Sequence, residues 1–166
     1  MMMPVSRLVI PLLLGCGAIS CSSAMEPIPG VSVPVTRLNS QPYSFTYYSQ
    51  LQQPERLVIR DQSAWMAAWR SLWPNGAPIP APPAIDFGKD MVVLAALGTR
   101  STGGFSILVD SARTTTEGLI VFIGTSAPGQ HCVTTQAFTQ PVDLARLPRT
   151  DGAVRFVDVP AVEDCQ

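Results

Sequence analysis

Residues 90–126, DMVVLAALGTRSTGGFSILVDSARTTTEGLIVFIGTS, decide the fold. They contain three apolar runs, Met91–Leu97, Phe105–Val109 and Leu119–Ile123, which are separated by short stretches rich in Gly, Ser, Thr and Arg. Runs this short with turn residues between them indicate β-strands. The connections are too short for parallel crossovers, so the pattern predicts an antiparallel meander. Because the first run is apolar at every position, we expect that strand to be covered on both faces, near the centre of a sheet.

A helix is predicted upstream of these strands. Tyr43–Ser49 and Glu55–Arg60 have the composition of strands, and Asp61 then has the right side chain to cap a helix that runs to Trp73. Apolar side chains at helical spacing form one wide stripe on that helix: Trp65, Ala68, Trp69, Leu72 and Trp73. Such a stripe can be a stacking platform for sugars or bases, but its spacing favours a face packed on the sheet.

The segment after the helix, Pro74–Ile85, contains five prolines and cannot form a helix or a central strand. It is either a polyproline recognition segment or a stiff loop, and we expect a stiff loop that carries the chain back to Met91.

The C-terminal part predicts more strands. His131–Thr139 is threonine-rich and reads as a strand ended by Pro141, and Val142–Thr150 continues it with a bend. Asp151-Gly152 is a turn signal before a last strand at Ala153–Val157. The sum is an α+β domain over residues 42–159, with a mostly antiparallel sheet of about six or seven strands, one amphipathic helix packed on a face, and a C-terminal tail at 160–166.

The N-terminus carries an export signal. A basic residue precedes the apolar stretch Leu8–Ile19, as in secretory signal peptides. The following Gly-Ala-Ile-Ser-Cys resembles a bacterial lipoprotein signal, which implies that residues 1–20 are removed and that Cys21 is lipidated, with palmitate among its acyl chains. Cys16 also follows a lipobox-like sequence, and cleavage after Ala24 in an ordinary secreted protein is the third alternative. The Ser after Cys21 implies sorting to the outer membrane, facing the periplasm or the cell surface. Residues 21–41 then form a proline-rich tether.

This assignment leaves two cysteines in the mature chain, Cys132 and Cys165. In an oxidising periplasm we expect a disulfide between them. The alternative is two free thiols, with Cys132 reactive beside His131.

The composition argues against several function classes. With 11 basic and 12 acidic residues and a formal charge of −1, the sequence has no basic stripe for nucleic acid. A single histidine and scattered carboxylates do not indicate a metal site, and Gly103-Gly104 lacks the lysine of a phosphate-binding loop. We therefore predict no cofactor, no metal and no nucleic-acid partner.

The stretch Asp86–Val93, followed by Gly98–Phe105 with its Thr-Gly-Gly-Phe sequence, resembles the PrcB C-terminal domain family. The proline-containing loop Ser126–Gln130 and the threonine-rich segment up to Pro141 are also similar to that family. The family is named for a lipid-anchored accessory subunit of a surface subtilisin-like protease complex. The resemblance therefore implies a non-enzymatic cell-envelope module that stabilises or regulates a protease, with no catalytic residues to transfer.

The meander brings two loops to one end of the predicted sheet, residues 98–104 and 124–131. Polar and glycine residues gather there: Arg100, Ser101, Thr102, Gly103, Gly104, Gln130 and His131. Glycines allow a partner's backbone to approach closely, so one interpretation is a recognition surface. The other is that both loops are merely long turns, where Gly and Ser are common.

An enzyme would need a base, and only His131 could serve, with Ser101, Ser126 or Cys132 as nucleophile. The sequence has no Gly-x-Ser-x-Gly elbow. We therefore expect a binding or accessory module rather than an enzyme. A periplasmic hydrolase that uses His131, or a purely structural envelope lipoprotein, are the alternatives.

Overall fold

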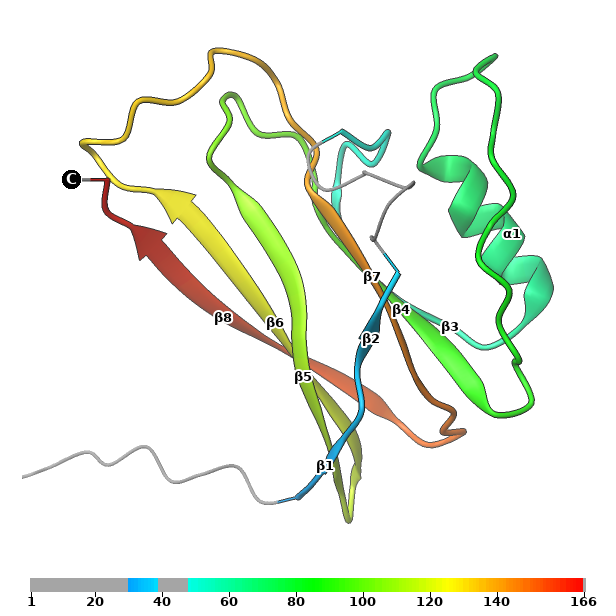
Figure 1. Ribbon diagram of the computed structural model, residues 1–166. Helices are drawn as coiled ribbons and strands as arrows, with labels where there is room; N and C mark the ends of the chain where they lie inside the picture. Colours follow the sequence, from blue (N-terminus) through cyan, green and yellow to red (C-terminus); the bar gives the residue numbers. More distant parts are fainter. Residues whose placement is uncertain (1–29, 39–47, 166) are drawn as a thin grey trace, which may run out of the picture.

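The computed structural model describes residues 30–38 and 48–165, which form two four-stranded β-sheets packed face to face and one helix (Figure 1). The predicted signal peptide, the candidate lipidation sites Cys16 and Cys21, and all but the end of the predicted strand 43–49 lie outside these residues. The elements in chain order are β1 (Val31–Val33), β2 (Thr36–Arg37), β3 (Pro54–Ile59), α1 (Gln62–Ser71), β4 (Asp90–Leu97), β5 (Ser106–Thr115), β6 (Gly118–Pro128), β7 (Val142–Pro148) and β8 (Val154–Glu163).

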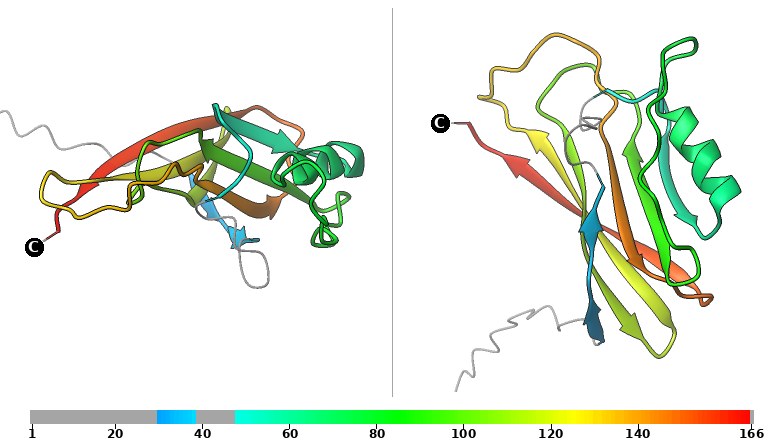
Figure 2. Two further views of the ribbon diagram at one scale, coloured as in Figure 1. Left: turned by 90° about the horizontal axis from the view of Figure 1, so that it is seen from above. Right: turned by 45° about the vertical axis from the view of Figure 1, so that its right-hand side comes forward.

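One sheet has the strand order β1-β5-β6-β8, and we call it the open sheet; the other has the order β2-β7-β4-β3 and packs against α1, and we call it the covered sheet. Neighbouring strands pair antiparallel except for β6 and β8, which are parallel. Figure 2 shows α1 and the proline-rich segment on one side of the molecule and the C-terminal end on the other. The predicted α+β class, mostly antiparallel with one helix, is confirmed.

Strand β4 has both faces buried, as its uniformly apolar sequence predicts. Met91, Val93 and Ala95 face the open sheet in the core between the two sheets. Val92 and Leu94 face the opposite way, into a second core formed with α1. Because β4 lies between β7 and β3, it is also an inner strand of its sheet.

The predicted meander is wrong in one respect, because β4 and β5 belong to different sheets. Only β5 and β6 form the expected hairpin. The physical reason lies in the two burial patterns. Strand β4 needs cover on both faces, whereas β5 alternates between buried and partly exposed residues and needs only one buried face. At Gly98, where the chain leaves β4, φ is +74° and a Cβ would lie 2.8 Å from the Gln52 carbonyl oxygen, so this position requires glycine.

Helix α1 begins as predicted, since the Asp61 side chain accepts a 2.8 Å hydrogen bond from the Ala64 N–H. Trp65 and Trp69 are fully buried against the covered sheet. Their indole N–H groups donate to carbonyls of the proline-rich segment, Trp65 to Pro83 at 3.1 Å and Trp69 to Pro80 at 2.8 Å. The tryptophan stripe is therefore core, and the proline-rich segment is the predicted stiff loop, which also satisfies two buried donors.

The two sheets include residues on both sides of the predicted domain, residues 42–159. Within the predicted tether, β1 pairs with β5 and β2 pairs with β7, and Pro34 separates these two strands as the chain passes from one sheet to the other. Val33 and Val35 pack on the core, which explains why this segment is held. Within the predicted tail, β8 continues to Glu163 because β6 supplies a pairing partner as far as Pro128.

The predicted strand His131–Thr139 is also wrong, because this segment is a loop that connects β6 in the open sheet to β7 in the covered sheet. A segment that passes between two layers has no continuous neighbour with which to form a ladder, and this outweighs the strand propensity of threonine. Thr139 alone makes a bridge, to Arg100. Strand β7 starts at Val142 as an independent element.

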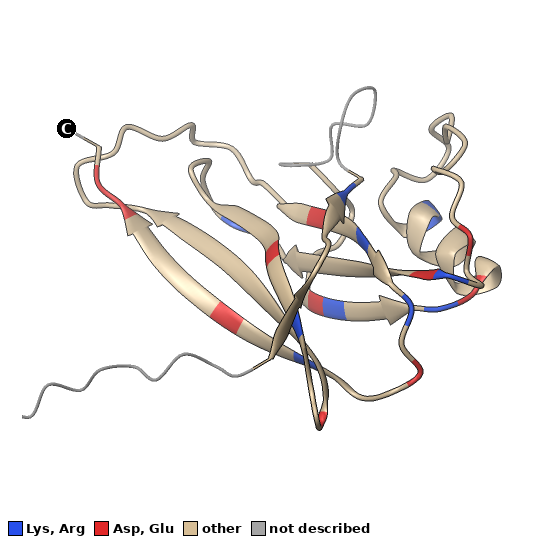
Figure 3. Ribbon diagram, turned by 60° about the horizontal axis from the view of Figure 1, so that its bottom comes forward, with Lys and Arg blue, Asp and Glu red and all other residues tan. Residues whose placement is uncertain are grey.

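Two polar side chains tie the sheets together. Asp143 of β7 is fully buried, and its Oδ2 accepts a 2.8 Å hydrogen bond from the Val109 N–H of β5 and lies 3.2 Å from Arg37 Nη2. Burial raises the pKa of Asp143, and the Val109 amide and Arg37 offset only part of that effect. Near the edge formed by β3 and β8, Arg56 pairs with Asp158 at 3.0 Å. Charged residues are otherwise spread over the molecule rather than gathered on one face (Figure 3).

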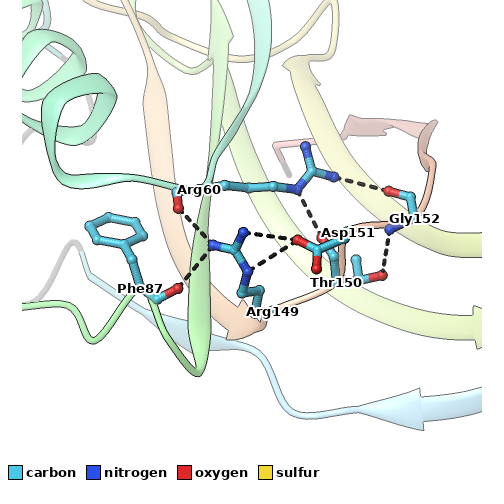
Figure 4. Close-up of polar contacts among 6 residues, drawn as sticks. All are labelled: Arg60, Phe87, Arg149, Thr150, Asp151 and Gly152. Atoms are coloured by element: carbon cyan, nitrogen blue, oxygen red, sulfur yellow. Dashed lines mark hydrogen bonds and ion pairs between the residues drawn. The ribbon is translucent and has the colours of Figure 1, made fainter.

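Two arginines fix the end of the sandwich at which β7 turns into β8 (Figure 4). Arg149 donates to the carbonyls of Arg60 and Phe87 at 2.8 and 2.9 Å and pairs with Asp151 at 2.8 Å. Arg60 in turn donates to the Thr150 carbonyl at 2.8 Å. These bonds hold the predicted Asp151-Gly152 turn, and they occupy both guanidinium groups with structural partners.

Candidate functional site

The β4–β5 loop (98–105) and the β6–β7 loop (129–141) meet at the end of the sandwich opposite the arginine cluster (Figure 1), and we call this surface the loop end. The predicted second loop, residues 124–131, is wrong over Gly124–Pro128, because these residues continue strand β6. The β5–β6 hairpin, which sets Ser106 opposite Ser126, brings the end of β6 beside the β4–β5 loop. The hydrogen bonds to that loop come from Thr135 and Thr139, later in the chain than predicted.

Hydrogen bonds join the two loops into one unit. The backbones of Arg100 and Thr139 exchange two bonds of 2.8 and 3.0 Å, and the Gly103 N–H donates to the Thr135 carbonyl at 2.9 Å. The Thr139 hydroxyl donates to the Thr102 carbonyl at 2.9 Å. Because these bonds fix the backbone of both loops, the loop end presents a preformed surface.

The two glycines of the loop end serve this internal contact. Gly104 has a φ of +86°, and a Cβ there would lie 3.1 Å from Cγ2 of Thr134 in the β6–β7 loop and 3.0 Å from the Cβ of Pro128 at the end of β6. Gly103 is buried against Thr135. The close approach that these glycines allow is therefore that of the other loop.

Arg100 is directed toward its own loop. Its Nη2 donates to the Leu97 carbonyl at 2.9 Å, and its guanidinium lies 5.7 Å from the centre of the Phe105 ring. The side chain is half-buried. In this arrangement Arg100 supports the β4–β5 loop. The exposed members of the predicted set are Ser101, Gly104, Gln130 and His131.

Sequence reasoning missed two apolar side chains on the loop end. Val133 and Phe138 of the β6–β7 loop have relative exposures of 102% and 70%, and Tyr48 nearby in the fold has 65%. Gln140, in the same loop, forms a bridge with Tyr48. The available signal was the presence of Val133 and Phe138 among the Thr, Gln and Ala residues of 133–139. The assignment of this segment to a strand concealed it. Exposed apolar surface of this kind is a candidate for contact with a partner.

The disulfide Cys132–Cys165 is formed, as expected, and connects the β6–β7 loop to the residues after β8. The Gly129 N–H donates to the Glu163 carbonyl at 2.8 Å beside it. The alternative of two free thiols is therefore wrong, and Cys132 is not a thiolate nucleophile in this structure.

The other hydrolase candidates are not arranged as a catalytic set. Ser126 Oγ lies 2.9 Å from Ser106 Oγ rather than on a histidine. His131 is exposed, and the hollow of about 400 Å³ beside the loop end is lined by Tyr48, Phe105 and Thr135, among others, and not by His131. Over the described residues, no group of three or more His, Cys, Asp or Glu side chains could hold a metal ion.

The described residues form a small two-sheet domain with one helix and with the loop end at one end of the sandwich. The model of the PrcB C-terminal family matches residues 91–148, which run from β4 through β7, about a third of the chain. This match confirms the resemblance to that family, and it includes every predicted residue of the loop end. No curated protein and no solved structure matches the chain. Within the described ranges, no helix is long and apolar enough to cross a membrane.

Proposed function

We propose that this protein is a lipid-anchored, non-enzymatic module of the cell envelope that contacts a protein partner, such as a protease, through its loop end. The family match supports an accessory role in a protease complex. The observation that carries the proposal is the presence of Val133 and Phe138, largely exposed, on loops whose backbones are already fixed.

Burial of the exposed apolar side chains by a partner would lower the free energy of the complex, because it removes apolar surface from water. The entropic cost is small, because the backbone of the loop end is already fixed. Residues of this kind often dominate the affinity of an interface. In the proposal Phe138 and Val133 are the anchors, and Ser101, Gln130 and His131 supply polar contacts around them.

The remaining predicted residues act indirectly in this proposal. Arg100, Thr102, Gly103 and Gly104 shape the β4–β5 loop through the contacts described above. Substitution of Arg100 should therefore weaken partner binding by moving the loop, while substitution of Phe138 should weaken it with the fold unchanged.

Site-specific photocrosslinking in native cells tests the contact surface. A photoreactive amino acid is placed at Ser101, Gln130 or Phe138 and, as a control, at Lys89 in the turn before β4, which has an exposed side chain. We expect the same protein adduct from the three loop-end positions and none from Lys89. A second comparison sets Phe138→Ser against Ile79→Ser, a half-exposed apolar residue in the proline-rich segment. Equal adduct yields from all four positions, or equal loss in both variants, would reject the loop end as the contact.

The lipid anchor is tested separately, because Cys21 lies outside the described residues. Metabolic labelling with an alkynyl palmitate analogue should label the protein and the Cys16→Ser variant, and should fail with Cys21→Ser. Labelling that depends on Cys16 instead would move the anchor to that cysteine.

A further inference from the structure

The outer face of the open sheet forms a second surface, a groove of about 1020 Å³ that runs across β5, β6 and β8. Leu108, Phe122 and Val157 give its floor an apolar character. The outer face of the covered sheet is packed against α1. Over the described residues, no helix packs on the outer face of the open sheet. The groove is therefore apolar surface that the described part of the fold leaves open to a ligand.

Gly124, in the interior of β6, lies in this groove between Leu108 of β5 and Val159 of β8, its partners in the two ladders. A Cβ at this position would meet nothing closer than 3.9 Å, and Gly124 is not among the glycines with positive φ. Neither the backbone nor the neighbouring side chains therefore require glycine here. Glycine inside a strand lowers stability and often marks a place where a ligand or another backbone approaches closely.

The charges around the groove favour a basic occupant. Its lining includes three carboxylates, Asp110, Asp158 and Glu163, and one guanidinium, that of Arg113. Asp158 is already paired with Arg56. Asp110 on β5 and Glu163 on β8 are both exposed, and they belong to the two strands that flank β6. A ligand that lies along β6 would thus have a carboxylate on each side.

The groove is also continuous with the loop end. Ser106, Ser126 and Glu163 line both the groove and the hollow of about 400 Å³ beside the loops. A partner that covers the loop end therefore has a direct path into the groove.

We propose that the groove binds an extended peptide segment of a protein, with a small apolar residue over Gly124 and lysine or arginine residues on either side. The inference that the occupant is a protein rests on the proposed function, because it uses the continuity with the loop end. The apolar floor, the space above Gly124 and the acidic residues on both flanking strands do not depend on it.

The test uses the purified protein and two fluorescent octapeptides, each with a Val-Ala-Leu-Val centre, one flanked by pairs of lysines and the other by pairs of glutamates. We expect the lysine-flanked peptide to bind and the glutamate-flanked peptide to bind at least tenfold more weakly. Gly124→Val fills the space and should weaken binding at least tenfold while the Tm stays the same or rises, since valine favours a strand. Thr114→Val, an exposed β5 position outside the groove lining, is the matched control and should bind as the parent does.

The inference is overturned if the lysine-flanked peptide does not bind, or if both peptides bind equally well. It is also overturned if Gly124→Val binds as the parent does. Stronger competition by sodium palmitate or phosphatidylglycerol vesicles than by unlabelled peptide would likewise overturn it, because the groove would then be a lipid site. A change of oligomeric state in Gly124→Val, measured by sedimentation, would instead assign the groove to a second copy of this chain and would also overturn it. The proposed function fails separately: in that case the loop-end positions give no crosslinks, whatever the peptides do.

Discussion

Removal of the Cys132–Cys165 disulfide should lower the free energy of unfolding by an amount that depends on the length of the loop it closes. The two cysteines are 33 residues apart, and the chain between them contains all of β7 and β8. In the chain-entropy model, opening a loop of that length costs about 3.7 kcal/mol. For a domain of this size, that loss corresponds to a decrease in Tm of roughly 7–15 °C.

The assay is urea unfolding of the Cys132→Ser/Cys165→Ser variant, followed by the fluorescence of the buried tryptophans Trp65 and Trp69. The parent protein in a reducing buffer is the matched control and should unfold at the same urea concentration as the double variant. A loss below about 1 kcal/mol, with the disulfide confirmed by mass in the parent, would refute the reasoning, because it would mean that the closed loop does not restrict the unfolded chain.

Three further substitutions test the buried Asp143, the start of α1 and the arginine contacts between β7 and β8. Because the pKa of Asp143 is raised, its contribution to stability is fully present below the ordinary aspartate pKa and is lost as the pH rises through the raised value. In urea titrations the stability of the parent relative to Asp143→Asn should therefore fall as the pH rises above the ordinary aspartate pKa, and a difference that grows with pH would contradict this. Asp61→Ala removes the hydrogen bond to Ala64 at the start of α1 and should lower the free energy of unfolding by about 1 kcal/mol, with little change for Asp61→Asn. Arg149→Lys keeps the charge but cannot make the same set of bonds to two carbonyls and Asp151, so calorimetry should show a loss of about 1–3 kcal/mol at low and at high salt alike.

Local and compositional features of the fold were accessible from the sequence. The burial of β4 on both faces follows from its uniformly apolar residues, and the start of α1 follows from Asp61. The disulfide followed from counting the cysteines that lie outside the predicted signal peptide and lipidation site. Each of these inferences uses residues that lie close together in the chain or a property of the whole chain.

The partition into two sheets was not accessible, because it depends on distant pairings. Strands β1 and β2 are 3 and 2 residues long, too short to show a period, and their partners β5 and β7 lie far along the chain. Pro160 suggests the end of a strand, yet β8 continues past it, and an edge strand tolerates proline.

At the candidate site, the β5–β6 hairpin was predictable, but the segment that contacts the β4–β5 loop and the roles of the side chains were not. Arg100 looked like a contact residue because it is a cation among small residues, and only the position of the Leu97 carbonyl and the Phe105 ring shows its bonding within the loop. Val133 and Phe138 were overlooked because their segment was assigned to a strand, whereas it is a loop that leaves both side chains exposed.

The strand order has a consequence for how the chain is made. The first strand of the open sheet, β1, pairs with β5, and its last, β8, pairs with β6, while β2 needs β7. Neither sheet can therefore be completed until nearly the whole polypeptide has left the ribosome. Contacts between such distant segments also form slowly. A nascent chain with this topology acquires its rigid shape only after the last β-strand has arrived.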